Sequence, residues 1–282
     1  MPAGVRRIHV QFIGATPGTL ETLRSTQRTA IVDENWENWR IWATNARENR
    51  CVNIAVSPMG QHQTRWATPV GSSTITLLRH GATEGYVPGM PFPLADGHGD
   101  PALAEPGVVQ AEDAGRRLAR EHVDGSPIAA IYITSLRRTS QTAAPLVAAL
   151  GLVPIVERDL REVFLGDWEG GEFRQRAAEG HPAVLAAMEQ GEWGHVPGAE
   201  TSAELEARCM GALERIADRH ADERVVCVVH GGVIAAVVAA ITGSNMKHFL
   251  GADNCSVTNA VRTPMGWRIR SFNDTSHLDG GW

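Results

Sequence analysis

The fold is decided by the stretch Thr74-Ile75-Thr76-Leu77-Leu78-Arg79-His80-Gly81. Its first five residues are β-branched or leucine, which is typical of a strand buried on both faces in a parallel sheet. Arg79, His80 and Gly81 follow without a break, and ligands bind at the carboxyl ends of strands in open α/β sheets. An arginine there can grip an anionic oxygen, and an imidazole can attack or exchange protons. Taken alone, Arg79 and His80 could equally be polar residues that end a strand at the solvent.

The composition excludes several classes of protein. The chain has 282 residues, of which 43% are hydrophobic and 21% charged, enough for one large α/β domain or a medium domain with an appendage. A net charge of −6 argues against nucleic acid or an anionic membrane as partner. Four cysteines without CxxC pairing indicate a reducing compartment and no disulfide framework. The sequence shows no membrane-spanning run and no signal-peptide core, so we expect a cytoplasmic protein.

Two domains are expected. Residues 1–70 differ from the rest in composition and pattern and are interpreted as an N-terminal extension of uncertain order. The stretch 57–73 is rich in Pro, Gly, Ser, Gln and Thr, which is typical of a linker. Residues 71–282 are expected to form the main domain.

Within the extension, two patterns predict local structure. His9–Ile13 and Cys51–Val56 could each form a short strand. Trp36, Trp39 and Trp42 recur at three-residue spacing, which predicts an aromatic ridge along a short helix. The ridge is either a docking surface or part of an adventitious extension, and we favour the second interpretation.

The main domain alternates buried strands with helices. The expected strands are 74–78, 128–133, 153–156 and 225–229, with a terminal hairpin of 256–260 and 267–272. The expected helices are 106–122, 143–150, 172–190, 202–220 and 233–241. This βαβ rhythm predicts a three-layer α/β/α sandwich around a mostly parallel central sheet.

Polar residues follow these strands at their carboxyl ends. His80 follows the first strand and His230 the fourth, and each is succeeded by glycine. Because the carboxyl ends of parallel strands meet at one sheet edge, we expect the two imidazoles to lie close together. Arg138 reaches the same edge from the start of a helix, whose N-terminus adds affinity for an anion. Glu162 follows the third strand and could supply a carboxyl group.

This combination of residues suits phosphoryl transfer. Two arginines neutralise a dianion and match the oxygen geometry of a phosphoryl group. A histidine can attack phosphorus, and nearby positive charge lowers its pKa from about 6.5 toward the neutral form that attack requires. A carboxylic acid such as Glu162 can protonate the leaving alkoxide and then act as base toward water. The second histidine would stabilise charge on the equatorial oxygens.

A metal site is the competing interpretation of one loop. Residues 85–101 hold four prolines, four glycines and no periodicity, and Asp96, His98 and Asp100 alternate within them. Carboxylate and imidazole groups on a glycine-rich loop are more often solvated than bound to metal. We therefore expect neither a metal nor a cofactor.

Together these segments resemble the histidine phosphatase superfamily, in its phosphoglycerate mutase-like branch. The resemblance covers roughly three quarters of the chain, with its motifs in the family's order. The matching segments are Leu78–Glu84, Asp100–Ala111, Ser135–Ala143, Glu162 with Gly166–Gly170, Pro197–Thr201 and Val229–Ile234.

The resemblance implies a role for each site residue. His80 is the implied phosphorylated nucleophile, with Glu162 as proton donor and His230 as the second catalytic histidine. Arg79 and Arg138, rather than Arg137, are the implied phosphate clamps. Gly231 is expected to bind the phosphate as well, whereas Glu169 and Glu200 stay unassigned.

The chain also departs from the family pattern. Tyr86 stands where many members have asparagine near the phosphate, and Ala82 where many have glutamate. The span from Glu162 to His230 is short for a mutase, which favours hydrolysis. The segment between Gly171 and Thr201 is expected to shape the pocket mouth. Its Trp193 and the nearby Phe164 could touch the substrate's organic part, although packing roles are equally plausible.

Three functions remain in view. The leading hypothesis is a metal-independent phosphatase that hydrolyses a small-molecule phosphomonoester through phospho-His80. The first alternative is phosphoglycerate mutase-type transfer to a second substrate hydroxyl. The other is a catalytically silent phospho-ligand-binding scaffold. The presence of all five catalytic and clamp residues disfavours it: Arg79, His80, Arg138, Glu162 and His230. The sequence leaves open which phosphoester is used and whether the chain forms a homodimer.

Overall fold

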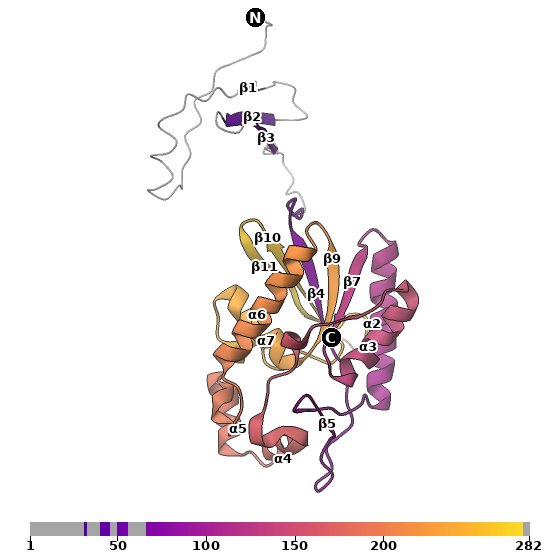
Figure 1. The fold of residues 1–282 in the computed structure, drawn as a ribbon, viewed down its shortest axis with the longest axis vertical. Coiled ribbons are helices and arrows are strands. Elements are labelled where there is room, and N and C mark those ends of the chain that lie inside the picture. Colours follow the sequence, from indigo (N-terminus) through magenta and orange to yellow (C-terminus); the bar gives the residue numbers. More distant parts are fainter. Residues whose placement is uncertain (1–30, 33–39, 46–49, 56–65, 279–282) are drawn as a thin grey trace, which may run out of the picture. The chain divides into compact units, whose positions relative to one another are not determined.

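The computed structural model describes residues 31–32, 40–45, 50–55 and 66–278. The chain divides into two compact units, Met1–Ala67 and Thr68–Trp282. Figure 1 shows the elements of each unit.

The first unit contains a small antiparallel sheet. Its strands are β1 (Ile31–Val32), β2 (Arg40–Asn45) and β3 (Arg50–Ala55), paired in the order β1-β2-β3. The strand predicted over Cys51–Val56 is confirmed by β3. The helix predicted from the tryptophan spacing is wrong at Trp42, which lies in β2 opposite Asn53. The isoleucine, tryptophan and threonine of β2 favour a strand, and this propensity outweighs a spacing based on three residues. His9–Ile13, Trp36 and Trp39 lie outside the described residues.

The second unit is built on a six-stranded sheet of order β11-β10-β4-β9-β7-β8. The sheet pairs β4 with β9, β9 with β7 and β7 with β8 in parallel, which confirms the predicted mostly parallel sheet. Strand β10 runs antiparallel to β4 and to β11, and its pairing with β11 confirms the predicted terminal hairpin. The strands are β4 (Ser73–Arg79), β7 (Ile128–Ile133), β8 (Ile155–Val156), β9 (Arg224–Val229), β10 (Val257–Thr263) and β11 (Gly266–Asp274).

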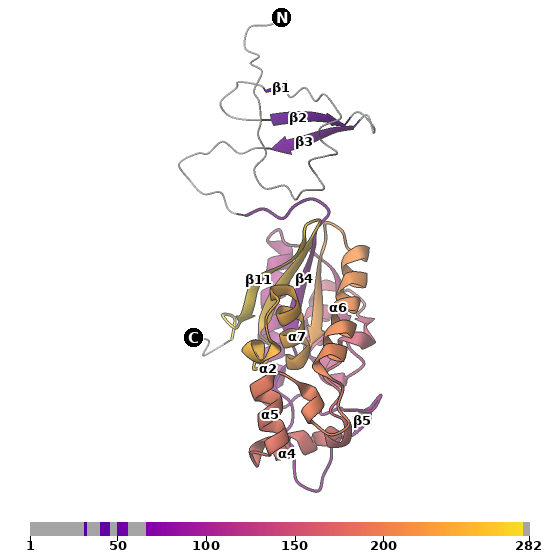
Figure 2. The ribbon, with the colours of Figure 1, turned by 90° about the vertical axis from the view of Figure 1, so that its left-hand side faces the viewer.

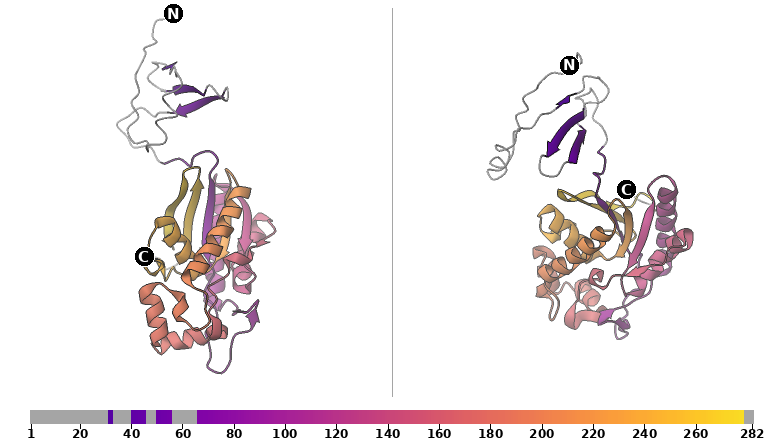
Figure 3. Two further views of the ribbon diagram at one scale, coloured as in Figure 1. Left: turned by 60° about the vertical axis from the view of Figure 1, so that its left-hand side comes forward. Right: turned by 45° about the horizontal axis from the view of Figure 1, so that its top comes forward.

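Helices cover both faces of this sheet, as Figures 2 and 3 show. On one face, α2 (Glu105–Val123) and α3 (Arg137–Leu150) share a buried cluster with alternate strand residues such as Leu78 and Val226. On the other, α6 (Ser202–Arg219) and α7 (Gly231–Thr242) pack on the opposite set, such as Leu77 and Cys227. Because successive strand residues point to opposite faces, one continuous apolar run supplies both layers. The predicted three-layer sandwich is confirmed.

The elements that overhang the carboxyl edge of the sheet depart from the sequence prediction. The loop 85–101 contains a short hairpin, β5 (Leu94–Ala95) with β6 (His98–Gly99). The single helix expected over 172–190 is two helices, α4 (Glu172–Ala178) and α5 (Pro182–Gln190). Gly180 takes a positive φ of 68° and Pro182 lacks an N–H, so the chain turns between them.

Short 3₁₀ turns complete the described fold: η1 (Arg158–Leu160), η2 (Gly166–Gly171), η3 (Trp193–His195) and η4 (Met246–Phe249). Among the described residues, no helix is both long enough and apolar enough to cross a membrane.

Candidate active site

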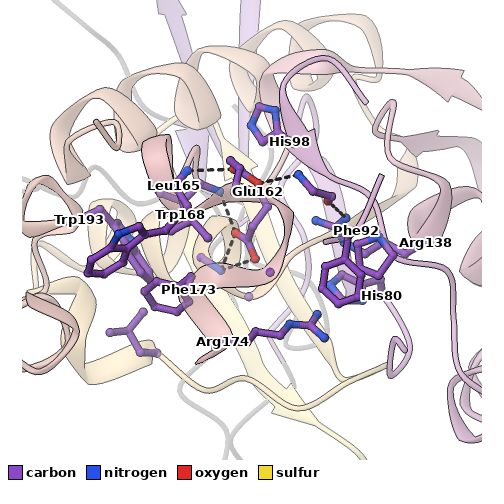
Figure 4. A pocket seen from close by; sticks show the side chains of 18 of the residues that line it. His80, Phe92, His98, Arg138, Glu162, Leu165, Trp168, Phe173, Arg174 and Trp193 are labelled. Carbon is purple, nitrogen blue, oxygen red and sulfur yellow. Dashed lines mark hydrogen bonds between the residues drawn. The ribbon is translucent and has the colours of Figure 1, made fainter. Parts of the chain in front are cut away.

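A cavity of about 330 Å³ opens at the carboxyl ends of β4 and β9. Figure 4 shows the side chains that line it, which come from the sheet edge on one side and from the overhanging segments on the other. Five of the six predicted site residues line the cavity: Arg79, His80, Arg138, Glu162 and Gly231. The sixth, His230, lies directly behind them.

The pairing of β4 with β9 brings the two histidines together. Arg79 lies opposite Val229 in this parallel pair, and the His80 N–H donates to the Val229 carbonyl at 2.9 Å. The rings of His80 and His230 are consequently 5.2 Å apart between centroids, tilted by 59°. The expectation that both imidazoles meet at one sheet edge agrees with this geometry.

The tautomer of His80 follows from its hydrogen bond. Its Nδ1 lies 2.8 Å from the Gly81 carbonyl oxygen, which can only accept, so Nδ1 carries the proton and Nε2 keeps its lone pair. Burial lowers the pKa of His80 well below its usual value, and the charges of Arg138 and Arg79 lower it further. Both effects favour the neutral ring that nucleophilic attack requires.

Close backbone packing fixes the turn that carries His80. A Cβ on Gly81 would lie 2.4 Å from the Gly107 carbonyl oxygen, and one on Gly107 would lie 1.9 Å from that of Ala82. The Gly81 N–H also donates to the Thr142 hydroxyl at 3.0 Å. Only glycine allows the turn after β4 to sit this tightly against the first turn of α2.

Arg138 is buried and Arg79 is half-buried, and the hydrogen-bond donors of these two predicted phosphate clamps are only partly used. Arg138, at the start of α3, donates through Nη1 to the Gly99 carbonyl at 2.9 Å. Arg79 donates to the Ala252 carbonyl, and its Nε has no hydrogen-bond partner. Burial lowers the pKa of both arginines, and the Glu162 charge opposes that effect. Donors that remain free beside the cavity are suited to an anionic ligand.

His230 holds Arg138 in place. It is fully buried, and its Nδ1 accepts from the Arg138 Nε–H at 3.3 Å. Its Nε2 therefore carries the proton and donates to the Thr134 hydroxyl at 3.1 Å. Since both ring nitrogens have protein partners, His230 acts here through Arg138, and the oxygen-stabilising role expected for it stays a prediction. Burial and the Arg138 charge lower its pKa well below the usual value.

Glu162 faces the same cavity from the segment after η1. Its Oε1 accepts the Val163 N–H at 3.0 Å and the Gly232 N–H at 3.1 Å. A Cβ on Gly232 would lie 2.6 Å from that oxygen, so glycine is required for the carboxylate to approach the start of α7. The first turn of α7 thereby positions the carboxyl group beside the arginines.

Several of the remaining lining residues form an apolar wall, which the sequence indicated only in part. As expected, the segment between Gly171 and Thr201 contributes to the cavity, with Phe173, Met188 and Trp193 among its residues. Phe164, the other aromatic residue considered, packs on His98 instead and does not line the cavity.

Sequence reasoning missed Arg174. Its guanidinium group enters the cavity from α4. No motif singled it out, because it lies in a polar helical stretch that resembles any solvated helix face.

The acidic residues near the site other than Glu162 are held by protein partners. Glu169 accepts the N–H groups of Leu165 and Gly99, which makes it a brace for the β5–β6 hairpin. Asp96 pairs with Arg158, and Asp100 accepts the Arg137 N–H at 2.9 Å. Across the described part of the chain, no group of three or more His, Cys, Asp or Glu side chains is arranged to hold a metal ion.

A sheet edge that presents an imidazole nitrogen, the guanidinium groups of Arg79 and Arg138 and a carboxylate is chemically suited to a phosphoryl group. The comparisons with known proteins agree with this class. The sequence model of the histidine phosphatase superfamily (branch 1) matches residues 75–275, and the chain belongs to this family.

Among curated relatives, phosphoglycerate mutase-like protein 4 of Arabidopsis thaliana is 33% identical over 217 residues, covering 74% of this chain and 89% of the relative. The metal-independent phosphoserine phosphatase of the same plant is 32% identical over 206 residues, covering 72% and 82%. Among solved structures, a mycobacterial glucosyl-3-phosphoglycerate phosphatase in complex with VO3 is 32% identical with a TM-score of 0.60, covering 72% of this chain and 99% of its own.

Proposed function

We propose that the protein is a metal-independent phosphatase that hydrolyses a small-molecule phosphomonoester through a phosphohistidine on His80. The observation that carries the proposal is the state of His80 in the cavity. Its Nδ1 donates to the Gly81 carbonyl, which leaves Nε2 for attack, and burial with the nearby arginine charges lowers its pKa in favour of the neutral ring. Arg79, Arg138 and Glu162 line the same cavity, so the groups needed around a phosphoryl ester are gathered there.

In the first step, Nε2 of His80 attacks phosphorus while the bond from phosphorus to the ester oxygen breaks. Glu162 enters this step as the carboxylic acid and gives its proton to the departing alkoxide, and the two arginines neutralise charge on the phosphoryl oxygens. In the second step, Glu162 takes a proton from water, which attacks phosphorus and breaks the P–N bond. Inorganic phosphate leaves, and His80 returns to its neutral state.

The names of the relatives support hydrolysis without deciding it. Two of the similar proteins named above are phosphatases of phosphorylated organic acids, whereas a third is named as mutase-like. A mutase would use the same first step and pass the phosphoryl group to a second substrate hydroxyl. The substrate's organic part would lie against the apolar wall of Leu165, Phe173, Met188, Trp193 and Leu250.

The test is phosphate release from p-nitrophenyl phosphate in the presence of EDTA. Wild type should turn over under these conditions, and His80→Ala should abolish turnover. His195→Ala is the matched control, because this histidine is exposed, bonds to Gln190 and lies outside the cavity. It should retain wild-type activity.

Two outcomes would contradict the proposal. If folded wild type released no more phosphate than His80→Ala from this ester and from a panel of phosphorylated metabolites, the chain would not be a phosphatase. Conversion of 3-phosphoglycerate to its 2-isomer would then identify a mutase, and phosphate binding without either reaction would identify a silent scaffold.

A further inference from the structure

Arg174 is the one lining arginine that the proposed mechanism does not use. It is the third residue of α4, and Figure 4 shows its side chain extending from that helix toward His80. Arg174 lines the same cavity as His80 and Arg138, and its charge contributes to the lowered pKa of both residues. It therefore approaches the position that an attacked phosphoryl group would occupy.

The position of Arg174 is fixed by contacts with the segment that follows the nucleophile. Its Nη1 donates to the Glu84 carbonyl at 2.8 Å, and its Nη2 donates to the Thr83 hydroxyl at 2.7 Å. The guanidinium carbon lies 5.0 Å from the centre of the Phe92 ring, a cation–π distance. Two of its five N–H donors are used in this way, and three are left for a ligand.

The charge of Arg174 has no protein counterpart. In the described part of the chain no carboxylate pairs with it, whereas Arg176 on the same helix pairs with Glu172 and Glu179. Arg174 is exposed at the cavity mouth, and partial desolvation there together with the nearby Arg79 charge lowers its pKa. Guanidinium groups held near one another at a cavity repel, and a bound anion would relieve that repulsion.

We propose that Arg174 is a third phosphate-binding arginine, which contacts the phosphoryl group at His80 from the α4 side. The inference rests on the proposed phosphate site, to which it adds a third arginine and a preference for dianionic ligands. Three guanidinium groups would select the dianion of a monoester over the monoanion of a diester. Arg174 would also help to keep His80 neutral, as attack requires.

The test measures binding of inorganic phosphate alone, by calorimetry at low ionic strength. Arg174→Gln should weaken phosphate binding about tenfold to a hundredfold, because a hydrogen bond to a charged group contributes about 1.5–3 kcal/mol. Arg176→Gln is the matched control, since Arg176 lies on the same helix and stacks on an aromatic ring, Trp168, but does not itself line the cavity. It should change phosphate binding less than twofold.

A second variant separates charge from structure. Arg174→Lys keeps the positive charge and should retain most of the affinity, with a loss of no more than about fivefold. If Lys and Gln weakened binding equally, the tether to Thr83 and Glu84 would be what matters, and the proposal would be wrong. Unchanged binding in Arg174→Gln would also overturn it.

A different function for Arg174 would give a different pattern. If it held a second anionic group of the substrate, Arg174→Gln would spare inorganic phosphate and p-nitrophenyl phosphate and would impair only phosphorylated carboxylic acids, which would refute the proposal. Because phosphate binding needs no turnover, the result does not depend on whether the protein is a hydrolase. Failure of hydrolysis with an intact effect of Arg174 would leave this inference standing.

Discussion

Replacing Gly232 by alanine would test whether Glu162 acts in proton transfer. The Gly232 N–H donates to Glu162 Oε1 at 3.1 Å, and a Cβ added at this position would lie 2.6 Å from the same oxygen. Carbon–oxygen contacts in proteins settle at about 3.3 Å or more, so the carboxylate must move by about 0.7 Å. The movement also stretches its hydrogen bond to the start of α7.

This displacement should cost activity without unfolding the protein. A misplacement of about 1 Å at a reacting group can lower a rate about 100-fold, so we expect kcat for an alkyl phosphate to fall about 30-fold to 100-fold. Gly232 does not have a positive φ, and alanine is the better helix former, so the free energy of unfolding should change by no more than about 1 kcal/mol.

The assay compares kcat and thermal unfolding of Gly232→Ala with those of Gly211→Ala. Gly211 lies in α6 outside the cavity, where an added Cβ would meet only the Arg215 guanidinium at 3.6 Å. The control should keep wild-type kcat. If Gly232→Ala hydrolysed the alkyl phosphate within threefold of wild type, the position of Glu162 would not matter and its role as proton donor would be refuted.

Two further predictions concern the same groups. Glu162→Gln should lower kcat about 10²-fold to 10⁴-fold for an alkyl phosphate, because its leaving group needs a proton. The loss should be much smaller for release of p-nitrophenolate, measured in single-turnover experiments. Equal losses for both esters would contradict the assignment of Glu162 as proton donor. The folded state holds His80 neutral while the unfolded chain binds a proton near pH 6.5, so acid favours unfolding and stability falls as pH drops below about 6.5. His80→Asn should therefore reduce the slope of unfolding free energy against pH by about 1.4 kcal/mol per unit below that value, measured by urea titration; an unchanged slope would show that His80 is protonated in the folded state.

The sheet and the residues along its edge could be predicted because each rests on a local pattern. Apolar runs of five or six residues mark β4, β7 and β9, and the polar residues that follow each run are carried to the edge by the strand geometry. His80 and Arg138 lie in the same cavity for this reason, although 57 intervening residues separate them in the sequence.

What could not be predicted depends on contacts between distant segments. Arg174 has the same local setting as Arg176, and only the packing of α4 beside Thr83 and Glu84 distinguishes the two. The burial of His230 behind Arg138 likewise depends on Thr134, which no spacing rule connects with it. The tryptophan spacing failed for another reason, since three-residue spacing over seven residues is too short to tell a helix from a strand.

The first turn of α7 links the parts of the site that come from separate strands. A Cβ on Gly231 would lie 3.4 Å from Arg79 Nε, and the Gly232 N–H donates to Glu162. Two consecutive glycines therefore lie against Arg79, at the end of β4, and against Glu162, which follows β8. Because β9 pairs directly with β4, the helix that follows β9 must begin beside the nucleophile's strand. The N-terminus of this helix carries partial positive charge, which favours both the carboxylate and an anionic ligand there. The β4–β9 pair thus fixes the nucleophile and the start of α7 relative to each other, and the Gly232 N–H holds the irregular segment that carries Glu162 against that helix.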